Sequence, residues 1–199
     1  MKSDIILSGV GGQGILSIAA TIGMAALENN LQLKQSEVHG MSQRGGAVES
    51  HLRISDKEIA SDLIPVGKAD LIISVEPMES LRYLPYLSEN GWLVTNSTPF
   101  VNITDYPDMN DVIKTIESLP HHVVIDADGI AKKIKSPRSS NMVMLGASSP
   151  FLDIPYESFE NGIRKIFGRK GEKIVSLNID ALNAGREFAE ESIKVEIKK

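Results

Sequence analysis

Six residues near the N-terminus have the composition and spacing of a phosphate-binding turn. Residues 9–14 read GVGGQG and contain the pattern G-x-G-x-x-G, between an apolar stretch typical of a strand and a long apolar segment typical of a helix. A glycine-rich turn at the start of a helix leaves backbone N–H groups and the positive end of the helix dipole facing outward. The same glycines also suit a tight strand-to-helix corner without a ligand, and the sequence leaves both interpretations open. If an anion binds, we expect it to contact Gly9, Gly11, Gly12, Gln13 and Gly14.

A second glycine-rich loop lies within residues 37–46, which read EVHGMSQRGG. Arg44 stands among small residues there, so its guanidinium is free to bind a carboxylate or a phosphate through two hydrogen bonds. Neighbouring amides would add a concave anion site, to which we expect Ser42, Gly45 and Gly46 to contribute. A surface ion pair or a subunit contact would explain Arg44 equally well. If both loops lie at the carboxyl ends of adjacent strands, they face one crevice, where open α/β sheets bind ligands.

The remaining titratable residues do not assemble into a catalytic or metal-binding group. His39 and His51 flank the second loop, but no Ser-His-Asp arrangement and no metal-ligand spacing includes them, so we interpret both as structural hydrogen-bonding residues. Asp126 and Asp128 are interpreted as a strand end and a helix cap. Glu37 lies about 20 residues beyond the first turn, where a dinucleotide-binding fold carries its ribose-binding acid. We therefore predict no catalytic residue and no metal site in this chain.

These candidate residues are positioned by alternating apolar patterns. Continuous apolar runs predict buried strands, and apolar residues three or four apart predict helices. Strand and helix alternate through the first two thirds, which predicts an α/β fold with a mostly parallel sheet and helices on both faces. We expect a single domain over residues 1–199 with a helical C-terminal part from about residue 128. The expected strands are 5–8, 47–54, 69–75, 92–96 and 122–126. The expected helices are one from 15, then 77–87, 108–119, 128–134, 141–148, 156–167 and one from 174.

Composition excludes several classes of function. The chain has no cysteine, so it cannot hold a thiolate-bound iron–sulfur cluster or a catalytic thiol. A net charge of −5 without a basic stripe argues against nucleic acid or an anionic membrane surface as a partner. The sequence contains neither a signal segment nor an apolar run of the roughly 18 residues that a membrane span needs, which predicts a cytoplasmic protein.

The two glycine loops together resemble a known family. GVGGQG followed by EVHGMSQRGGAVESHLRIS over residues 37–55 is similar to the gamma-type subunits and domains of the 2-oxoacid:ferredoxin oxidoreductases, and within them to the small subunit of the indolepyruvate enzymes. The segments 67–73 and 96–98 follow in the order expected for that family. The resemblance implies a Rossmann-like α/β module that covers most of the chain.

The same resemblance implies the chemistry of a larger enzyme. Thiamine diphosphate and iron–sulfur clusters are expected on a large partner subunit, ferredoxin is the expected electron acceptor, and coenzyme A is the expected co-substrate. The substrate would be an aryl pyruvate such as indolepyruvate. This chain would hold no redox cofactor, and it would complete the active site and the subunit interface. Coenzyme A phosphates would contact the two glycine loops.

Two other functions stay open at this stage. A stand-alone NAD- or FAD-dependent oxidoreductase is supported by the glycine turn and Glu37, although 199 residues leave little room for a separate substrate domain. A purely structural subunit, whose glycine loops pack against a partner and bind no ligand, is the second alternative.

Overall fold

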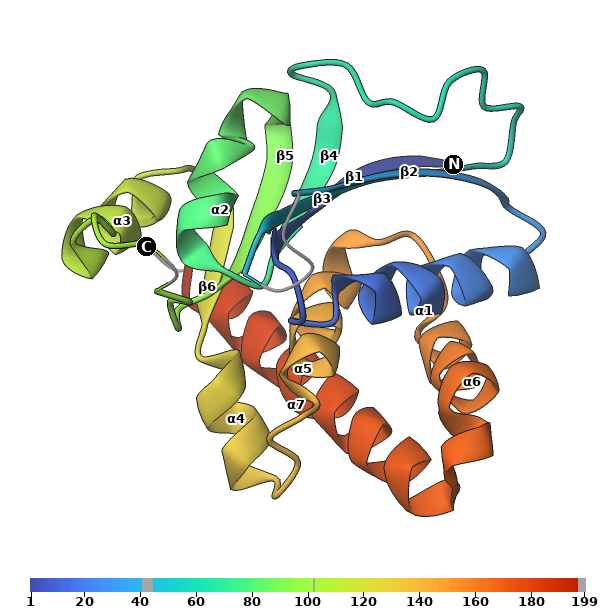
Figure 1. Cartoon of the computed structure of the whole chain (residues 1–199). Helices are drawn as coiled ribbons and strands as arrows, with labels where there is room; N and C mark the ends of the chain where they lie inside the picture. Colours follow the sequence, from blue (N-terminus) through green and yellow to red (C-terminus); the bar gives the residue numbers. More distant parts are fainter. Residues whose placement is uncertain (41–44, 102, 197–199) are drawn as a thin grey trace.

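The computed structural model describes residues 1–40, 45–101 and 103–196. Its centre is a six-stranded sheet in the order β2-β3-β1-β4-β5-β6 (Figure 1). Strands β1, β4, β5 and β6 pair in parallel, whereas β3 runs antiparallel to both β1 and β2. The predicted sheet is therefore confirmed as mostly parallel, with one reversed strand. The strands are β1 (Lys2–Val10), β2 (Gln32–His39), β3 (Ala47–Ser55), β4 (Ala69–Ser74), β5 (Leu87–Asn96) and β6 (His122–Ile125).

Helices cover both faces of this sheet (Figure 1). Helices α1, α4, α5, α6 and α7 pack on one face, and α2 and α3 pack on the other. Side chains of β1 alternate between the two layers, since Ile5 and Leu7 join the first core and Ile6 joins the second. The helices are α1 (Ile15–Glu28), α2 (Pro77–Arg82), α3 (Met109–Glu117), α4 (Ala127–Lys133), α5 (Ser140–Ser148), α6 (Tyr156–Phe167) and α7 (Glu172–Glu196).

Two glycines let α5 and α7 touch along their backbones. A Cβ atom on Gly146 would lie 1.9 Å from the carbonyl oxygen of Leu182, and one on Gly185 would lie 2.0 Å from that of Val143. No side chain fits at either position, because real Cβ atoms do not approach backbone oxygens this closely. This close contact holds the long helix α7 in the layer that also contains α1 and α5, the helices that flank the glycine turn.

Most predicted elements are confirmed, and their boundaries differ where turn chemistry decides them. Asp108 caps α3 as expected by accepting a hydrogen bond from the amide of Asn110. Helix α2 stops at Arg82 and gives way to a single 3₁₀ turn over Leu84–Tyr86, since Pro85 ends the helical pattern. The strand expected over 92–96 already begins at Leu87.

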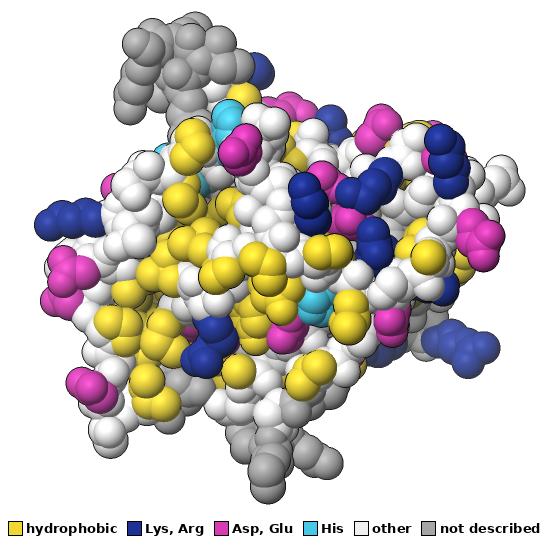
Figure 2. Space-filling model, turned by 90° about the horizontal axis from the view of Figure 1, so that it is seen from above, with side chains coloured by type: hydrophobic (Ala, Val, Ile, Leu, Met, Phe, Trp, Pro, Cys, Tyr) yellow, Lys and Arg dark blue, Asp and Glu magenta, His cyan; other side chains and the backbone are white. Residues whose placement is uncertain are grey.

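The face seen from above in Figure 1 is rich in apolar side chains, which gather near its middle (Figure 2). Leu63 and Val66, in the connection between β3 and β4, are 54% and 66% exposed. On the connection between β5 and α3, Phe100, Val101 and Ile103 are also exposed. Within the described ranges, no helix has both the length and the apolar character needed to cross a membrane.

Candidate functional site

The glycine turn lies between the carboxyl end of β1 and the first residue of α1. Gly14 is the N-cap of α1 and has φ +83°, a left-handed conformation that favours glycine. Gly9 is needed for a close approach instead, because a Cβ atom there would lie 2.3 Å from Cγ2 of Val75. Both glycines therefore make the tight corner that the sequence allowed, and this role is compatible with ligand binding.

The second glycine loop lies directly against the first. The amide of Gly11 donates to the carbonyl of Gly46 at 2.9 Å, and Val10 at the end of β1 is paired with Ala47 at the start of β3. The two loops thus meet at the carboxyl end of β1. The strands that lead into them, β1 and β2, are separated by β3, so they are not the adjacent strands that the prediction assumed. Gly45 and Gly46 are part of this contact, whereas Ser42 and Arg44 lie outside the described residues.

Several backbone amides of the turn are available to a ligand. Helix α1 has no side-chain cap, and among the described residues the amides of Gly12 and Gly14 donate to no backbone carbonyl. Unpaired amides and the positive helix dipole favour an anion. The amide of Gly11 is already paired with Gly46. The turn therefore offers Gly12 and Gly14 rather than every glycine of the motif.

The side chain of Gln13 links the glycine turn to the carboxyl ends of β1 and β4. Its Oε1 accepts from the amide of Val10 at 2.7 Å, and its Nε2 donates to the carbonyl of Val75 at 3.3 Å. We had expected its side-chain amide to face an anion. The structure uses one of the two amide hydrogens to tie the turn to the end of β4, which leaves the other for a ligand.

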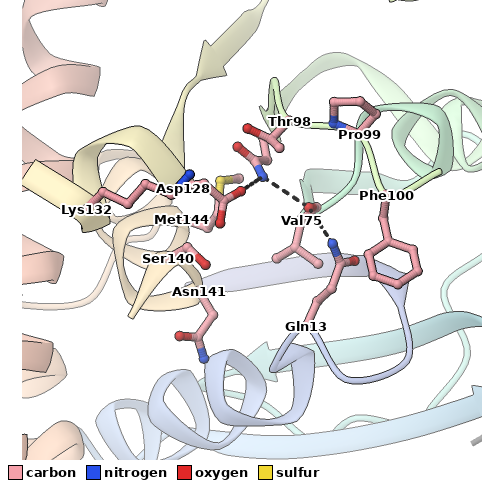
Figure 3. Close-up of a pocket in the computed structure, with 11 residues that line it drawn as sticks. Gln13, Val75, Thr98, Pro99, Phe100, Asp128, Lys132, Ser140, Asn141 and Met144 are labelled. Atoms are coloured by element: carbon pink, nitrogen blue, oxygen red, sulfur yellow. Dashed lines mark hydrogen bonds between the residues drawn. The ribbon is translucent and has the colours of Figure 1, made fainter. Parts of the chain in front are cut away.

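A crevice of about 360 Å³ opens beside the turn at the carboxyl ends of β1, β4 and β5 (Figure 3). The crevice adjoins the boundary between β1 and β4. This boundary is the switch point of the sheet, because the chain continues from β1 to β2 on one side and later returns to β4 on the other side. Its floor is polar, since Asn96 donates to Oδ2 of Asp128 at 2.8 Å and accepts from the amide of Ala127. The lining residues are Gln13, Val75, Asn96, Thr98, Pro99, Phe100, Asp128, Lys132, Ser140, Asn141 and Met144.

The pair Asp126 and Asp128 divides into two roles. Asp126 follows β6 and caps α4 by accepting from the amide of Gly129 at 2.8 Å, so the cap expected from this pair is made by Asp126 and not by Asp128. Asp128 lies in the first turn of α4 and faces the crevice (Figure 3). Sequence reasoning missed Asn96 and Asn141 as crevice residues. Asn96 ends an expected strand, and that position was a signal, whereas nothing local pointed to Asn141.

The buried carboxylate of Glu76 holds the segment 98–100, which forms the roof of the crevice. Glu76 is fully buried and accepts from the amides of Glu79 and Phe100 at 2.8 and 3.3 Å, and from the hydroxyl of Tyr106. Burial raises the pKa of Tyr106, and the hydrogen bond to Glu76 raises it further. The hydroxyl therefore keeps its proton and stays a donor. Sequence reasoning also missed Glu76, although an acidic residue before a proline at a helix start is a cap signal.

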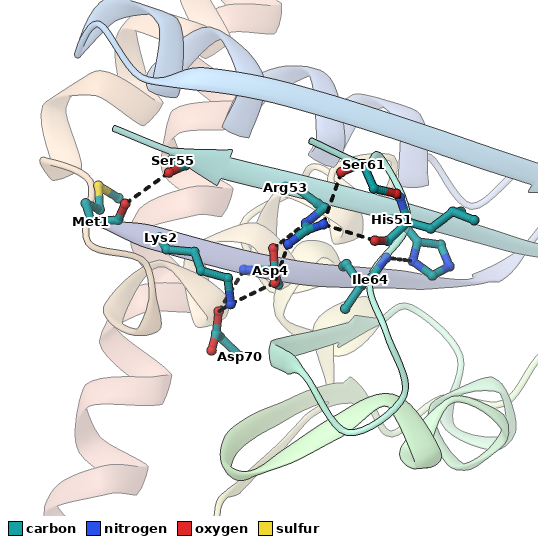
Figure 4. A network of polar contacts seen from close by, with 10 residues as sticks. Met1, Lys2, Asp4, His51, Arg53, Ser55, Ser61, Ile64 and Asp70 are labelled. Carbon is teal, nitrogen blue, oxygen red and sulfur yellow. Dashed lines mark hydrogen bonds and ion pairs between the residues drawn. The ribbon is translucent and has the colours of Figure 1, made fainter. Parts of the chain in front are cut away.

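His51 takes part in a structural network that begins at the opposite end of β1 (Figure 4). Its Nδ1 accepts from the amide of Ile64 at 3.0 Å, so the proton of the neutral ring lies on Nε2, 2.7 Å from Glu49. Arg53 pairs with the buried carboxylate of Asp4 at 2.7 Å and donates to two carbonyls of the β3–β4 connection. The structural interpretation of His51 is confirmed. The side chain of His39 is outside the described part of the chain.

The sheet order weakens the dinucleotide interpretation of Glu37. In a dinucleotide-binding fold the strand that precedes the ribose-binding acid lies next to the first strand. Here β3 separates β2 from β1, and Glu37 lies on β2 at the sheet edge. The glycine turn and Glu37 therefore do not form the expected pair.

An open, mostly parallel α/β sheet with a glycine turn at its switch point defines a Rossmann-like α/β module. Comparison with known families makes this more specific, because the model of the family described as pyruvate ferredoxin/flavodoxin oxidoreductase matches residues 4–188. The chain belongs to this family. The resemblance that the two glycine loops predicted is confirmed.

Individual relatives agree with the family match. The chain is 35% identical to indolepyruvate oxidoreductase subunit IorB of Archaeoglobus fulgidus, over 93% of this chain and 94% of that protein. It is 36% identical to the subunit of the same name from Methanothermobacter thermautotrophicus, over 96% of this chain and all of that protein. Among solved structures, 2-oxoglutarate:ferredoxin oxidoreductase from Magnetococcus marinus shares the fold, with a TM-score of 0.77 at 23% identity over 96% of this chain and 31% of that one. The chain is thus a small subunit of the 2-oxoacid:ferredoxin oxidoreductase type.

Proposed function

We propose that this chain is the non-redox subunit of a thiamine-dependent indolepyruvate:ferredoxin oxidoreductase. The likeness to two IorB subunits along nearly their whole length supports the aryl pyruvate substrate. The sequence has no cysteine, so the iron–sulfur clusters would be bound by a partner chain. In the solved Magnetococcus marinus enzyme the matching region is 31% of a longer chain, which supports a module that works joined to other parts.

In this complex the partner would hold thiamine diphosphate, which supplies the decarboxylation chemistry. The overall reaction converts the 2-oxoacid anion and the thiol of coenzyme A to an acyl thioester, carbon dioxide and one proton, and it passes two electrons to ferredoxin. The chain contributes no electron carrier to it. Its role would be to bind and orient coenzyme A and to close the active site against water.

Coenzyme A would bind where the two glycine loops meet. The Magnetococcus marinus enzyme was solved with coenzyme A and succinyl-CoA bound, which supports a coenzyme A site in relatives of this fold. The free amides of Gly12 and Gly14 suit its phosphates. Arg44, Ser42, Gly45 and Gly46 would complete the anion site from the second loop, and Gly9, Gly11 and Gln13 would shape the turn.

The subunit interface would lie at the same rim. The crevice is lined in part by Phe100, which is 42% exposed. Just beyond it, Val101 and Ile103 are 66% and 46% exposed. Exposed apolar side chains in one short segment are typical of a surface that a partner covers. Because Glu76 and Tyr106 hold this segment over the crevice, the partner would contact both the roof and the ligand site.

An Arg44→Ala variant of the assembled complex tests the ligand role. Loss of a charge-assisted phosphate contact is expected to raise the KM for coenzyme A about tenfold, with little change in the KM for the 2-oxoacid. Arg164→Ala is the matched control, because it removes an exposed arginine of α6 that pairs with the exposed Glu172. If Arg44→Ala instead weakens assembly and leaves the KM for coenzyme A unchanged, the purely structural alternative is correct.

Co-purification tests the partner. The chain isolated from its own cell should bring a large, cysteine-rich subunit that contains thiamine diphosphate. A chain that is recovered alone with full oxidoreductase activity would instead support the stand-alone alternative.

A further inference from the structure

A second and larger cavity, of about 510 Å³, adjoins the crevice, because Gln13 and Asn141 line both. Gly12, Gly14 and Ser17 form one wall, so it reaches the glycine turn from the side of α1. The connection between α4 and α5 forms the second wall, and the α6–α7 corner forms the third. Three segments that are far apart in the sequence therefore enclose one space.

Positive charge gathers in this cavity. Lys135, Arg138 and Lys170 line it, and among its described lining residues none is aspartate or glutamate. The chain as a whole carries a net charge of −5, so the cavity has the opposite sign to the protein. In the part of the chain that the structure describes, none of the three cations forms an ion pair. Their charge is available to a ligand.

Two helices begin at the wall of the same cavity. Gly14 is the N-cap of α1 and Ser139 is the N-cap of α5, and neither helix has a side-chain cap. The Ser139 hydroxyl bonds to the Ser136 hydroxyl at 2.7 Å and not to an amide of α5. Asn141 joins the two helix starts by donating to the carbonyl of Gly14 at 3.2 Å. Both positive helix ends thus add to the field of the three cations.

One wall of the cavity is apolar. Phe167, Ile174 and Leu177 line it from the α6–α7 corner, and Lys170 lies over the ring of Phe167 at 5.3 Å. Inorganic phosphate would leave this wall in contact with water. An organic phosphate would cover it, and the cavity volume lies in the range of small-molecule sites, roughly 300–1,000 Å³.

We propose that this cavity binds the phosphate groups of a phosphorylated organic molecule of nucleotide size. Arg138, Lys135 and Lys170 would contact the phosphates together with the amides at the start of α1 and α5, and the apolar wall would contact the organic part. Coenzyme A carries such phosphates and so does a free nucleotide. The cavity would accept either, whether or not the function proposed above holds.

Calorimetric titration of the full chain tests this site. The probes are ADP, coenzyme A, adenosine and inorganic phosphate, and the test variant is Arg138→Ala/Lys170→Ala. The matched control is Arg164→Ala/Lys68→Ala, which removes the same two residue types from exposed positions that do not line the cavity. Circular dichroism checks that both variants fold.

We expect ADP, coenzyme A or both to bind the parent chain, with adenosine binding at least about tenfold more weakly than the best phosphorylated probe. The test variant should raise the Kd of that probe at least about tenfold, and the control should change it less than about twofold. If ADP and coenzyme A both bind, the cavity recognises the phosphates that the two molecules share. If coenzyme A binds and ADP does not, the ligand of the cavity is coenzyme A.

Three results would overturn the proposal. These are adenosine binding as tightly as ADP, equal losses in the test and control variants, and no binding of ADP or coenzyme A at about 1 mM. Because the titration needs no partner subunit, it stays informative even if the chain fails to assemble with a thiamine-bearing protein. A failed assembly would contradict only the function proposed above.

Discussion

Replacing Gly14 by alanine should destabilise the protein by more than backbone strain alone. Its φ of +83° costs an L-residue about 1–2 kcal/mol. The added Cβ would also lie 2.6 Å from Nδ2 of Asn141, so that side chain must move away. Its hydrogen bond to the Gly14 carbonyl, worth about 0.5–1.5 kcal/mol, would then be lost. The expected loss in free energy of unfolding is about 1.5–3.5 kcal/mol.

Gly12→Ala is the control for this prediction. Gly12 also has a positive φ, +101°, but a Cβ atom there would meet nothing within 4 Å. Its expected cost is therefore the strain alone, about 1–2 kcal/mol. Urea denaturation of both variants, and of each combined with Asn141→Ala, separates the contact from the strain. If Gly14→Ala costs no more than Gly12→Ala, or its excess persists without the Asn141 side chain, the described packing of the turn is wrong.

Three further predictions concern the parts of the fold that support the site. Arg53→Ala leaves the carboxylate of Asp4, which is 1% exposed, with Lys2 as its one ionic partner among the described residues. We expect a loss of about 2–4 kcal/mol in the free energy of unfolding by urea, and a loss below about 0.5 kcal/mol would contradict the pairing. Burial raises the pKa of Glu79 above its unfolded value of 4.5, so the stability it contributes is present below that value and is lost as pH rises through the folded pKa. The advantage of Glu79→Gln over the parent in unfolding free energy should therefore grow as the pH rises above 4.5, and a difference that does not change with pH would refute this. Gly185→Ala should lower the thermal midpoint strongly or prevent folding, because its Cβ meets a backbone oxygen of α5, whereas Gly168→Ala, with open space around it, should shift the midpoint little.

Local patterns predicted the elements of the fold better than their arrangement. The apolar run of β4 and the Asp108 cap are visible within a few residues, because burial and capping are local signals. The position of β3 between β1 and β2 depends on pairing between distant segments, and no periodicity reports it. The order of the strands therefore had to come from the structure.

Local sequence patterns also predicted only part of the candidate site. The glycine turn was predictable because its residues are consecutive in the sequence and need a special backbone conformation. Asn141 contacts Gly14 across 127 positions of sequence, and Glu76 holds Phe100 and Tyr106 across 24 and 30. Contacts of this kind leave no local signal. The sheet rule made a meeting of the two loops conditional on where their strands lie, and the hydrogen bond from Gly11 to Gly46 shows that the loops do meet.

Hydrogen–deuterium exchange of the assembled complex, with and without coenzyme A, tests most directly whether the two glycine loops form a ligand site. Peptides that cover residues 9–17 and 40–47 should exchange more slowly when coenzyme A is present, while the peptide that covers residues 56–68 at the other end of the sheet should not change. Slower exchange that is confined to the partner subunit, with both loops unchanged, would contradict a role of this chain in binding coenzyme A.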